Sequence, residues 1–195
     1  MKPENMEAIL TTAKKMFARY GLRKTSIDEI ARAARVAKGT IYNYFGSKDQ
    51  VYLGVLKREA DEIVRNISLS VDKVSSPEEK LTAFFRAKFR YMRQAINILN
   101  LDREGMEKCL PAAESIRNEF FEQEIRIIDS ILRQGLEKGI FRLGDILLTA
   151  KAIVYALRGF EPNWLIQESE ERIDQYLAQL LNLLFFGIVV EKSAD

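Results

Sequence analysis

Two short stretches of helical periodicity, separated by only a few residues, limit what this chain can fold into more than any other feature. The first stretch follows Ser26-Ile-Asp-Glu29, a capping-box pattern in which the serine oxygen accepts a backbone N–H and the glutamate bonds back to the serine N–H. Its apolar residues share one helix face, at i, i+3, i+4 and i+7: Ile27, Ile30, Ala31 and Ala34. The pattern predicts a helix of about two turns that begins just after Ser26.

The second stretch begins after the turn segment Arg35-Val-Ala-Lys-Gly-Thr40. Ile41, Tyr44 and Phe45 form a short apolar stripe that ends at Gly46, and Ser47-Lys-Asp-Gln50 repeats the capping pattern ahead of a longer helix. Two short helices joined by a tight turn, the second lined by Lys, Thr and Tyr, fit a helix-turn-helix.

A longer amphipathic helix, roughly residues 3–20, precedes this pair and is predicted to end at Gly21. Later helices are predicted from Ser76-Pro77, after Pro111 as far as Gly139, and over about 145–160 and 170–190. The predicted fold class is therefore all-α. It comprises a three-helix DNA-binding domain over residues 1–47 and a helical ligand-binding and dimerisation domain over residues 48–195.

Charge is unevenly divided along the chain, although the net charge is only +2. Residues 1–58 contain twelve Lys and Arg against five Asp and Glu, whereas the remainder contains eighteen against twenty-three. A positive excess attracts a polyanion over about a Debye length, roughly 10 Å at moderate salt. The N-terminal part therefore suits nucleic acid, although solvated basic faces are also common.

The runs Thr25-Ser-Ile-Asp-Glu-Ile-Ala31, Val36-Ala-Lys-Gly-Thr-Ile-Tyr-Asn-Tyr-Phe45 and Ser47-Lys48 closely resemble the DNA-binding domain of the tetracycline-repressor (TetR) family. The resemblance covers about residues 6–55, and the rest of the chain resembles the family only in length and helical character. It implies a homodimer, bound to a palindromic operator in double-stranded DNA and released by a small molecule. One position departs from the family, because Arg35 stands where glycine is usual. If positive φ is needed there, a non-glycine residue costs about 1 kcal/mol.

Helix-turn-helix proteins place the N-terminal end of the second helix in the major groove. Gly39 would permit close approach, Lys38 could donate to guanine, Asn43 could pair with adenine, and Thr40 or Tyr42 could contact a thymine methyl or a phosphate. The residues predicted to reach bases are Ala37, Lys38, Gly39, Thr40, Tyr42 and Asn43.

Phosphate contacts are expected from Tyr44, Lys48 and the helix start at Ser26. The resemblance implies backbone contacts for Tyr42, Tyr44 and Lys48. Tyr44 could equally be a core aromatic with its hydroxyl at the rim, and Lys48 could be a solvated lysine. Ile41 and Phe45 are predicted to be core.

The two late helices are apolar on more than one face, which predicts contact with both the core and a second subunit. The resemblance implies the same dimer interface. Aromatic and methionine side chains could line an apolar ligand pocket, although such stripes are more often plain core. The candidates are Phe85, Phe89, Met92, Met106, Phe120, Phe121, Tyr155 and Trp164.

Several function classes are disfavoured by the composition. The chain has no histidine and no recognisable catalytic motif, so we expect no enzyme, no metal site and no cofactor. A single cysteine, Cys109, and no leader-like start favour a cytoplasmic setting. The apolar stretch 177–190 is too short for a membrane span, which needs about 20 residues, and is interpreted as a buried helix. The leading hypothesis is a ligand-released dimeric repressor. The alternative is a DNA-binding activator or architectural protein without a ligand.

Overall fold

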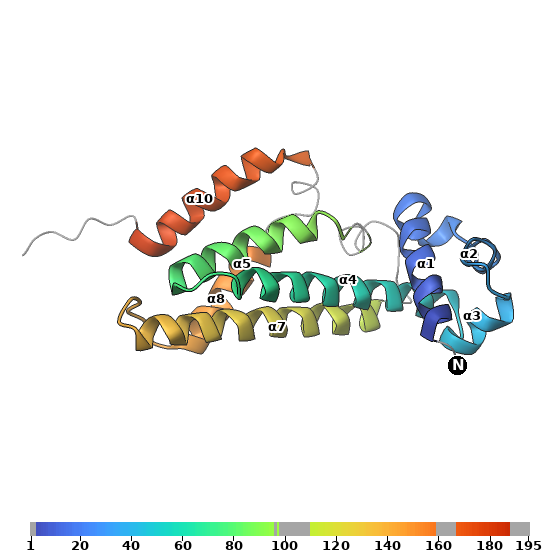
Figure 1. Cartoon of the computed structure of the whole chain (residues 1–195), viewed down its shortest axis with the longest axis horizontal. Helices are drawn as coiled ribbons and strands as arrows, with labels where there is room; N and C mark the ends of the chain where they lie inside the picture. The colour runs from blue at the N-terminus through green and yellow to red at the C-terminus, as the bar shows by residue number, and fades with distance from the viewer. Residues whose placement is uncertain (1–2, 96, 98–109, 159–166, 188–195) are drawn as a thin grey trace, which may run out of the picture.

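The computed structural model describes residues 3–95, 97, 110–158 and 167–187, and within these ranges it holds helices and no strands. The predicted all-α class is confirmed. Figure 1 shows α1, α2 and α3 gathered at one end, while α4, α5 and α7 run along the length of the molecule with α8 and α10 on their outer sides. The helices are α1 (Pro3–Lys24), α2 (Ile27–Ala34), α3 (Lys38–Phe45), α4 (Lys48–Val71), α5 (Pro77–Met92), α7 (Leu110–Glu137), α8 (Ile146–Arg158) and α10 (Glu170–Phe186).

Serine caps set where the helices begin. At α2 the Glu29 backbone N–H donates to Ser26 Oγ at 3.2 Å, and the Ser26 N–H donates to the Glu29 carboxylate at 2.8 Å, so the predicted capping box is complete. Ser76 and Glu79 form the same box ahead of Pro77 at the start of α5. Ser47 accepts from the Gln50 N–H at 3.2 Å, which is the serine half of the pattern predicted for α4.

Glycines end or interrupt the helices at the predicted points. Helical geometry in α1 breaks at Gly21, where φ is 80° and ψ is 165°, and a further short turn then reaches Lys24. Gly46 and Gly139 also have positive φ, which an L side chain rarely adopts.

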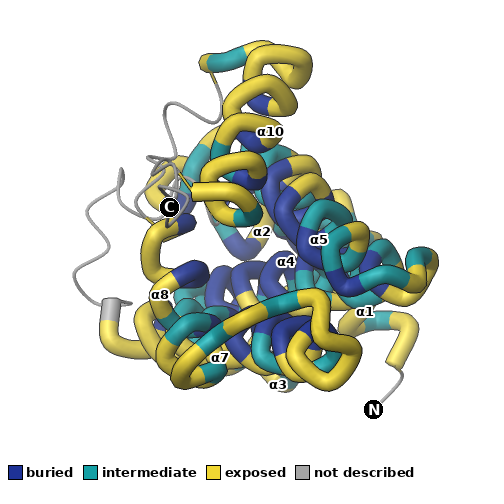
Figure 2. The backbone as a smooth tube through the Cα atoms, turned by 90° about the vertical axis from the view of Figure 1, so that its left-hand side faces the viewer, coloured by how far each residue is buried: buried dark blue, intermediate teal, exposed yellow. Residues whose placement is uncertain are grey.

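Two hydrophobic cores share α4. The N-terminal core packs Ile9, Phe17, Ile30 and Ile41 of the first three helices against the start of α4, from Val51 to Leu56. The second core begins at Ala60 and unites the rest of α4 with α5, α7, α8 and α10. Figure 2 shows the buried residues on the faces that these helices turn toward one another. A single continuous helix therefore belongs to both cores.

The outer faces of α8 and α10 carry large apolar side chains exposed in the single chain. The described part of the stretch interpreted as a buried helix, up to Gly187, is therefore buried on one face only, because Leu177 and Leu181 are in the core while Leu183, Leu184 and Phe186 are exposed. Within the described ranges, no helix combines the length and apolarity needed to cross a membrane. The exposed apolar residues on the two helices are Leu147, Leu148, Tyr155, Tyr176, Leu183, Leu184 and Phe186.

Candidate functional site

The turn between α2 and α3 contains the position where a glycine was expected. Arg35 adopts φ 56° and ψ 41°, which lies in the left-handed region. Among the residues that the structure describes, all others with positive φ are glycines. The Val36 N–H donates to the Ala31 carbonyl at 3.0 Å, and the Arg35 N–H to the Arg32 carbonyl at 3.3 Å. These bonds close the end of α2, so the motif is intact, and Arg35 has the positive φ on which the predicted strain depends.

Most of the residues predicted to reach bases lie on one exposed face of α3. Ala37 is the N-cap, and Lys38, Gly39, Tyr42 and Asn43 are exposed. Thr40 is half-buried. A Cβ added to Gly39 would meet no atom within 4 Å, so the helix backbone is open to close approach there. Ile41, on the opposite side, is fully buried and fixes this helix to the N-terminal core.

Lys38 is held toward α2 by an ion pair with Asp28, in which the two charged atoms are 2.8 Å apart. The hydrogen bond to Asp28 raises the pKa of Lys38, so the amine is protonated at neutral pH. Both side chains are about half exposed, and exposed pairs of this kind are weak. The ammonium can therefore exchange Asp28 for a base or phosphate acceptor.

Lys48 has structural partners that sequence reasoning missed. Its ammonium donates to the Leu22 carbonyl at 2.8 Å and to the Thr25 carbonyl at 3.1 Å. Thr25, which is buried, donates to the Gly21 carbonyl at 2.8 Å. The lysine thus ties the start of α4 to the junction between α1 and α2, close to Ser26.

Tyr44 and Phe45 are half-buried and pack against the N-terminal core, with ring centroids 6.3 Å apart. The core position predicted for Phe45 is therefore only partly reached. The position of Tyr44 fits the alternative of a core aromatic at the rim.

One buried amide, that of Asn97, is bonded to both α1 and α4, and sequence reasoning missed it as well. Asn97 Nδ2 donates to the Glu59 carboxylate at 2.8 Å and to the Lys14 carbonyl of α1 at 3.1 Å. The Tyr52 hydroxyl donates to the Asn97 carbonyl at 3.3 Å. Asn97 and Glu59 are both almost fully buried. No local pattern could have revealed this cluster, because it joins residues between 38 and 83 positions apart.

Of the candidate ligand-pocket residues that the structure describes, all but Tyr155 belong to the second core or pack against it. Phe85, Phe89 and Phe120 are buried in the second core, and Met92 and Phe121 pack at its edge. Tyr155 is 52% exposed on α8. Met106, Trp164 and Cys109 lie outside the described residues.

Inside the second core, a buried lysine and glutamate form an ion pair. Lys88 Nζ is 2.5 Å and 2.6 Å from the two carboxylate oxygens of Glu124. Its ammonium also lies 5.3 Å from the Phe120 ring centroid and 5.7 Å from that of Phe121. Burial lowers the pKa of Lys88 and raises that of Glu124, while their mutual attraction opposes both shifts. In the sequence, Lys88 lies within the apolar stripe of α5, and this position is the feature from which its burial could have been predicted.

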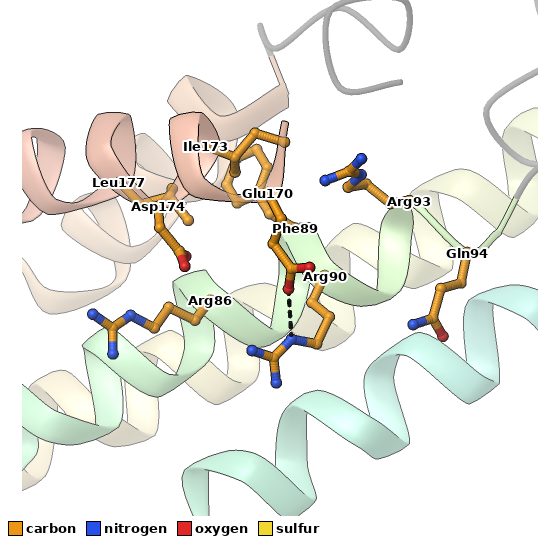
Figure 3. A pocket seen from close by; sticks show the side chains of 9 residues that line it. All are labelled: Arg86, Phe89, Arg90, Arg93, Gln94, Glu170, Ile173, Asp174 and Leu177. Carbon is orange, nitrogen blue, oxygen red and sulfur yellow. Dashed lines mark ion pairs between the residues drawn. The ribbon is translucent and has the colours of Figure 1, made fainter. Parts of the chain in front are cut away.

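A groove of 390 Å³ lies between α5 and α10 (Figure 3). Its α5 side carries Arg86, Arg90 and Arg93, and its α10 side carries Glu170 and Asp174. Phe89, Ile173 and Leu177 form an apolar floor. Among the described residues, no cluster of three or more Cys, Asp or Glu side chains could hold a metal ion.

An exposed recognition helix in a helix-turn-helix, mounted on a larger helical domain, defines the class of DNA-binding transcriptional regulators. Residues 9–55 match the sequence pattern of the bacterial regulatory proteins of the tetR family. The chain is 32% identical to the HTH-type transcriptional repressor KstR2 of Mycolicibacterium smegmatis over 138 residues, which cover 70% of this chain and 67% of the relative. The chain belongs to the tetR family.

Two further comparisons extend over nearly the whole chain. The fatty acid metabolism regulator protein of Bacillus subtilis is 22% identical over 188 residues, which cover 96% of each chain. The crystal structure of FadR from Bacillus subtilis, solved in complex with stearoyl-CoA, matches with a TM-score of 0.71 and 22% identity, covering 94% of this chain and 99% of that one. These similarities extend the shared fold to the C-terminal helices.

Proposed function

We propose that this regulator is a homodimeric repressor that binds a palindromic operator and releases it when a fatty acyl thioester binds the C-terminal domain. The observation that carries the DNA-binding part is the exposed face of α3, whose opposite side is fixed by the buried Ile41. A protein that regulates transcription must reach chromosomal DNA, so the proposal also includes a cytoplasmic location. It assigns the chain a regulatory role and no enzymatic one.

The recognition helix enters the major groove by its N-terminal end. Gly39 allows the backbone to approach the base edges, Lys38 donates to guanine acceptors, and Asn43 pairs with adenine. Tyr42, which is 46% exposed, reaches a phosphate or a thymine methyl. Lys48 and the α2 start at Ser26 hold phosphates, since both lie at the α1–α2 junction and Ser26 is a helix N-cap.

The dimer forms through the outer faces of α8 and α10. Leu148 and Phe186 are 65% and 77% exposed, and a two-fold contact would remove such side chains from water. Two-fold symmetry would also present two copies of α3 to half-sites about 34–36 Å apart.

The effector proposal draws on the relatives and on the chemistry of the C-terminal domain. One relative is named for fatty acid metabolism, and one solved neighbour holds stearoyl-CoA. In this chain the domain combines an interior rich in phenylalanine with an arginine-lined groove, which suits a ligand that has a long apolar chain and an anionic head. Such a ligand would bias the separation of the two recognition helices.

The test is a mobility-shift titration of the full chain on the intergenic DNA upstream of its own gene. We expect a salt-sensitive shift, protection of a palindrome, and release by stearoyl-CoA but not by stearate or by CoA. Binding that ignores every acyl thioester would favour the activator or architectural alternative. Failure to bind any such DNA at low salt would overturn the repressor proposal.

A further inference from the structure

We propose that the groove between α5 and α10 binds the phosphate groups of the effector, so that a nucleotide pyrophosphate lies along the arginines of α5. This proposal rests on the proposed function, because it assigns the site for the head of an acyl-CoA. It identifies residues on this chain that would distinguish a thioester of CoA from a free fatty acid.

The three arginines follow the spacing of one helix face, with Arg93 at the C-cap of α5. Arg86, Arg90 and Arg93 are spaced at i, i+4 and i+7, which places them along one side of α5. Arg90 is paired with Glu170 at 3.6 Å, with side chains that are 58% and 68% exposed. Within the described residues, Arg86 and Arg93 have no carboxylate within ion-pair distance. A planar guanidinium can bond two phosphate oxygens at once, so a row of three suits a polyphosphate more than a single carboxylate.

The acidic wall of α10 competes with this ligand. Figure 3 shows Glu170 and Asp174 on α10 facing the arginine side of the groove, with the dashed line joining Glu170 to Arg90. The Arg90–Glu170 pair is long and solvated, so it is weak and can be displaced. A phosphate that binds Arg90 must displace the Glu170 carboxylate. Removal of that carboxylate should therefore strengthen phosphate binding, whereas removal of an arginine should weaken it.

The floor of the groove connects the charged walls with the apolar core. Phe89, Ile173 and Leu177 are each at most 4% exposed, and all three belong to the hydrophobic core of the C-terminal domain. A ligand whose phosphates lie on these arginines would therefore have the apolar core directly beneath them. The volume of 390 Å³ falls within the range usual for small-molecule sites. This pairing of cationic wall and apolar floor fits an amphiphile.

Calorimetric titration of the full chain tests the assignment. The ligands are stearoyl-CoA, CoA, stearate and ADP, and each is measured at low and moderate salt. The variants are Arg90→Gln, Arg93→Gln and Glu170→Gln. Arg126→Gln serves as the matched control, since Arg126 is an exposed arginine in a separate groove between α4 and α7.

We expect either arginine substitution to weaken stearoyl-CoA binding by roughly tenfold to a hundredfold and to reduce its salt dependence, because a charge-assisted bond is lost. Glu170→Gln should tighten binding severalfold. Stearate binding and the affinity for operator DNA should stay unchanged in all three variants, and Arg126→Gln should match the wild type throughout.

Two results would overturn the site without touching the proposed function. One is operator release by stearoyl-CoA with the same affinity in wild type and both arginine variants. The other is ADP binding as tight as stearoyl-CoA, which would assign the groove to free nucleotides. Conversely, arginine-dependent binding of stearoyl-CoA without operator release would support the site and contradict the proposed effector response.

Discussion

Lys88 and Glu124 face each other in the middle of the C-terminal core, with the lysine Nζ within 2.6 Å of both glutamate oxygens and both side chains at most 2% exposed. Thirty-six residues separate them in sequence, on α5 and α7. The attraction within such a pair must offset the loss of water around both charges, so we expect the pair to add little net stability and to favour one alignment of the two helices.

Removing one member of this pair should be far more damaging than removing both. Glu124→Gln leaves a buried ammonium without a counter-charge, and we expect a loss of about 3–5 kcal/mol in the free energy of unfolding. The double variant Lys88→Met/Glu124→Leu should recover most of that loss. Urea denaturation of the wild type, the single variant and the double variant measures both effects. Equal destabilisation of the single and double variants would contradict this account.

The left-handed backbone at Arg35 predicts a stabilising substitution. Arg35→Gly removes the Cβ that disfavours this conformation, and we expect a gain of about 1 kcal/mol in the free energy of unfolding. Arg35→Ala, which keeps the Cβ, is the control and should give no such gain. Thermal unfolding of the three proteins distinguishes them, and a destabilised glycine variant would show that the turn is unstrained.

Gly39 should be dispensable for folding and necessary for operator binding. A Cβ there meets no atom of the protein, so Gly39→Ala should leave the melting temperature unchanged or slightly raised. If the backbone approaches the bases, the added methyl should weaken operator binding by about tenfold or more, which is roughly 1.4 kcal/mol. Fluorescence anisotropy on labelled operator DNA measures the affinity. Full affinity in the alanine variant would place Gly39 away from the groove.

The capping box of α2 predicts a loss of stability in acid. The hydrogen bond from the Ser26 side chain lowers the pKa of Glu29 below its ordinary value of 4.5, and the hydrogen bond from the Ser26 backbone N–H adds a smaller shift in the same direction. A carboxyl with a depressed folded pKa stabilises the protein above pH 4.5, and this contribution is lost as pH falls through the folded pKa. Glu29→Gln should therefore lower the melting temperature at pH 7 and matter progressively less below pH 4.5. A difference that stays constant across this range would exclude the ionised cap.

A charge on the outer face of α8 should separate the proposed dimer. Leu148→Glu places a carboxylate where an apolar contact is expected, so sedimentation should show monomers and operator affinity should fall at least tenfold. The control is Leu69→Glu, on a 49% exposed leucine of α4. If both variants remain dimeric, the interface lies elsewhere.

The local features of the fold could be predicted because they depend on neighbouring residues. The serine caps at Ser26 and Ser76, the break at Gly21 and the stripe from Ile27 to Ala34 follow from spacing and backbone chemistry, and the structure confirms them. The unusual turn was visible from the single residue Arg35.

Contacts across long sequence separations were beyond prediction. Sequence alone could show that Lys88 interrupts an apolar stripe, but not that Glu124 would be opposite. The bonds from Lys48 to the Leu22 and Thr25 carbonyls, and those of Asn97, depend on how helices pack. Likewise, the helical spacing of Arg86, Arg90 and Arg93 can be seen in the sequence, and a helix near α10 was predicted, but the packing of that helix against α5 could not be.

The sharing of α4 between the two cores has a geometric consequence. Its 24 residues rise about 36 Å at 1.5 Å per residue, from the cap beside α3 to its far end at Val71. If the end of α4 at Val71 stays fixed, a tilt of the helix by only about 5° moves its N-terminal end by about 3 Å. This distance is about the donor–acceptor length of a hydrogen bond. Small adjustments among side chains deep in the C-terminal core can thus be enlarged into the gain or loss of contacts at a base edge.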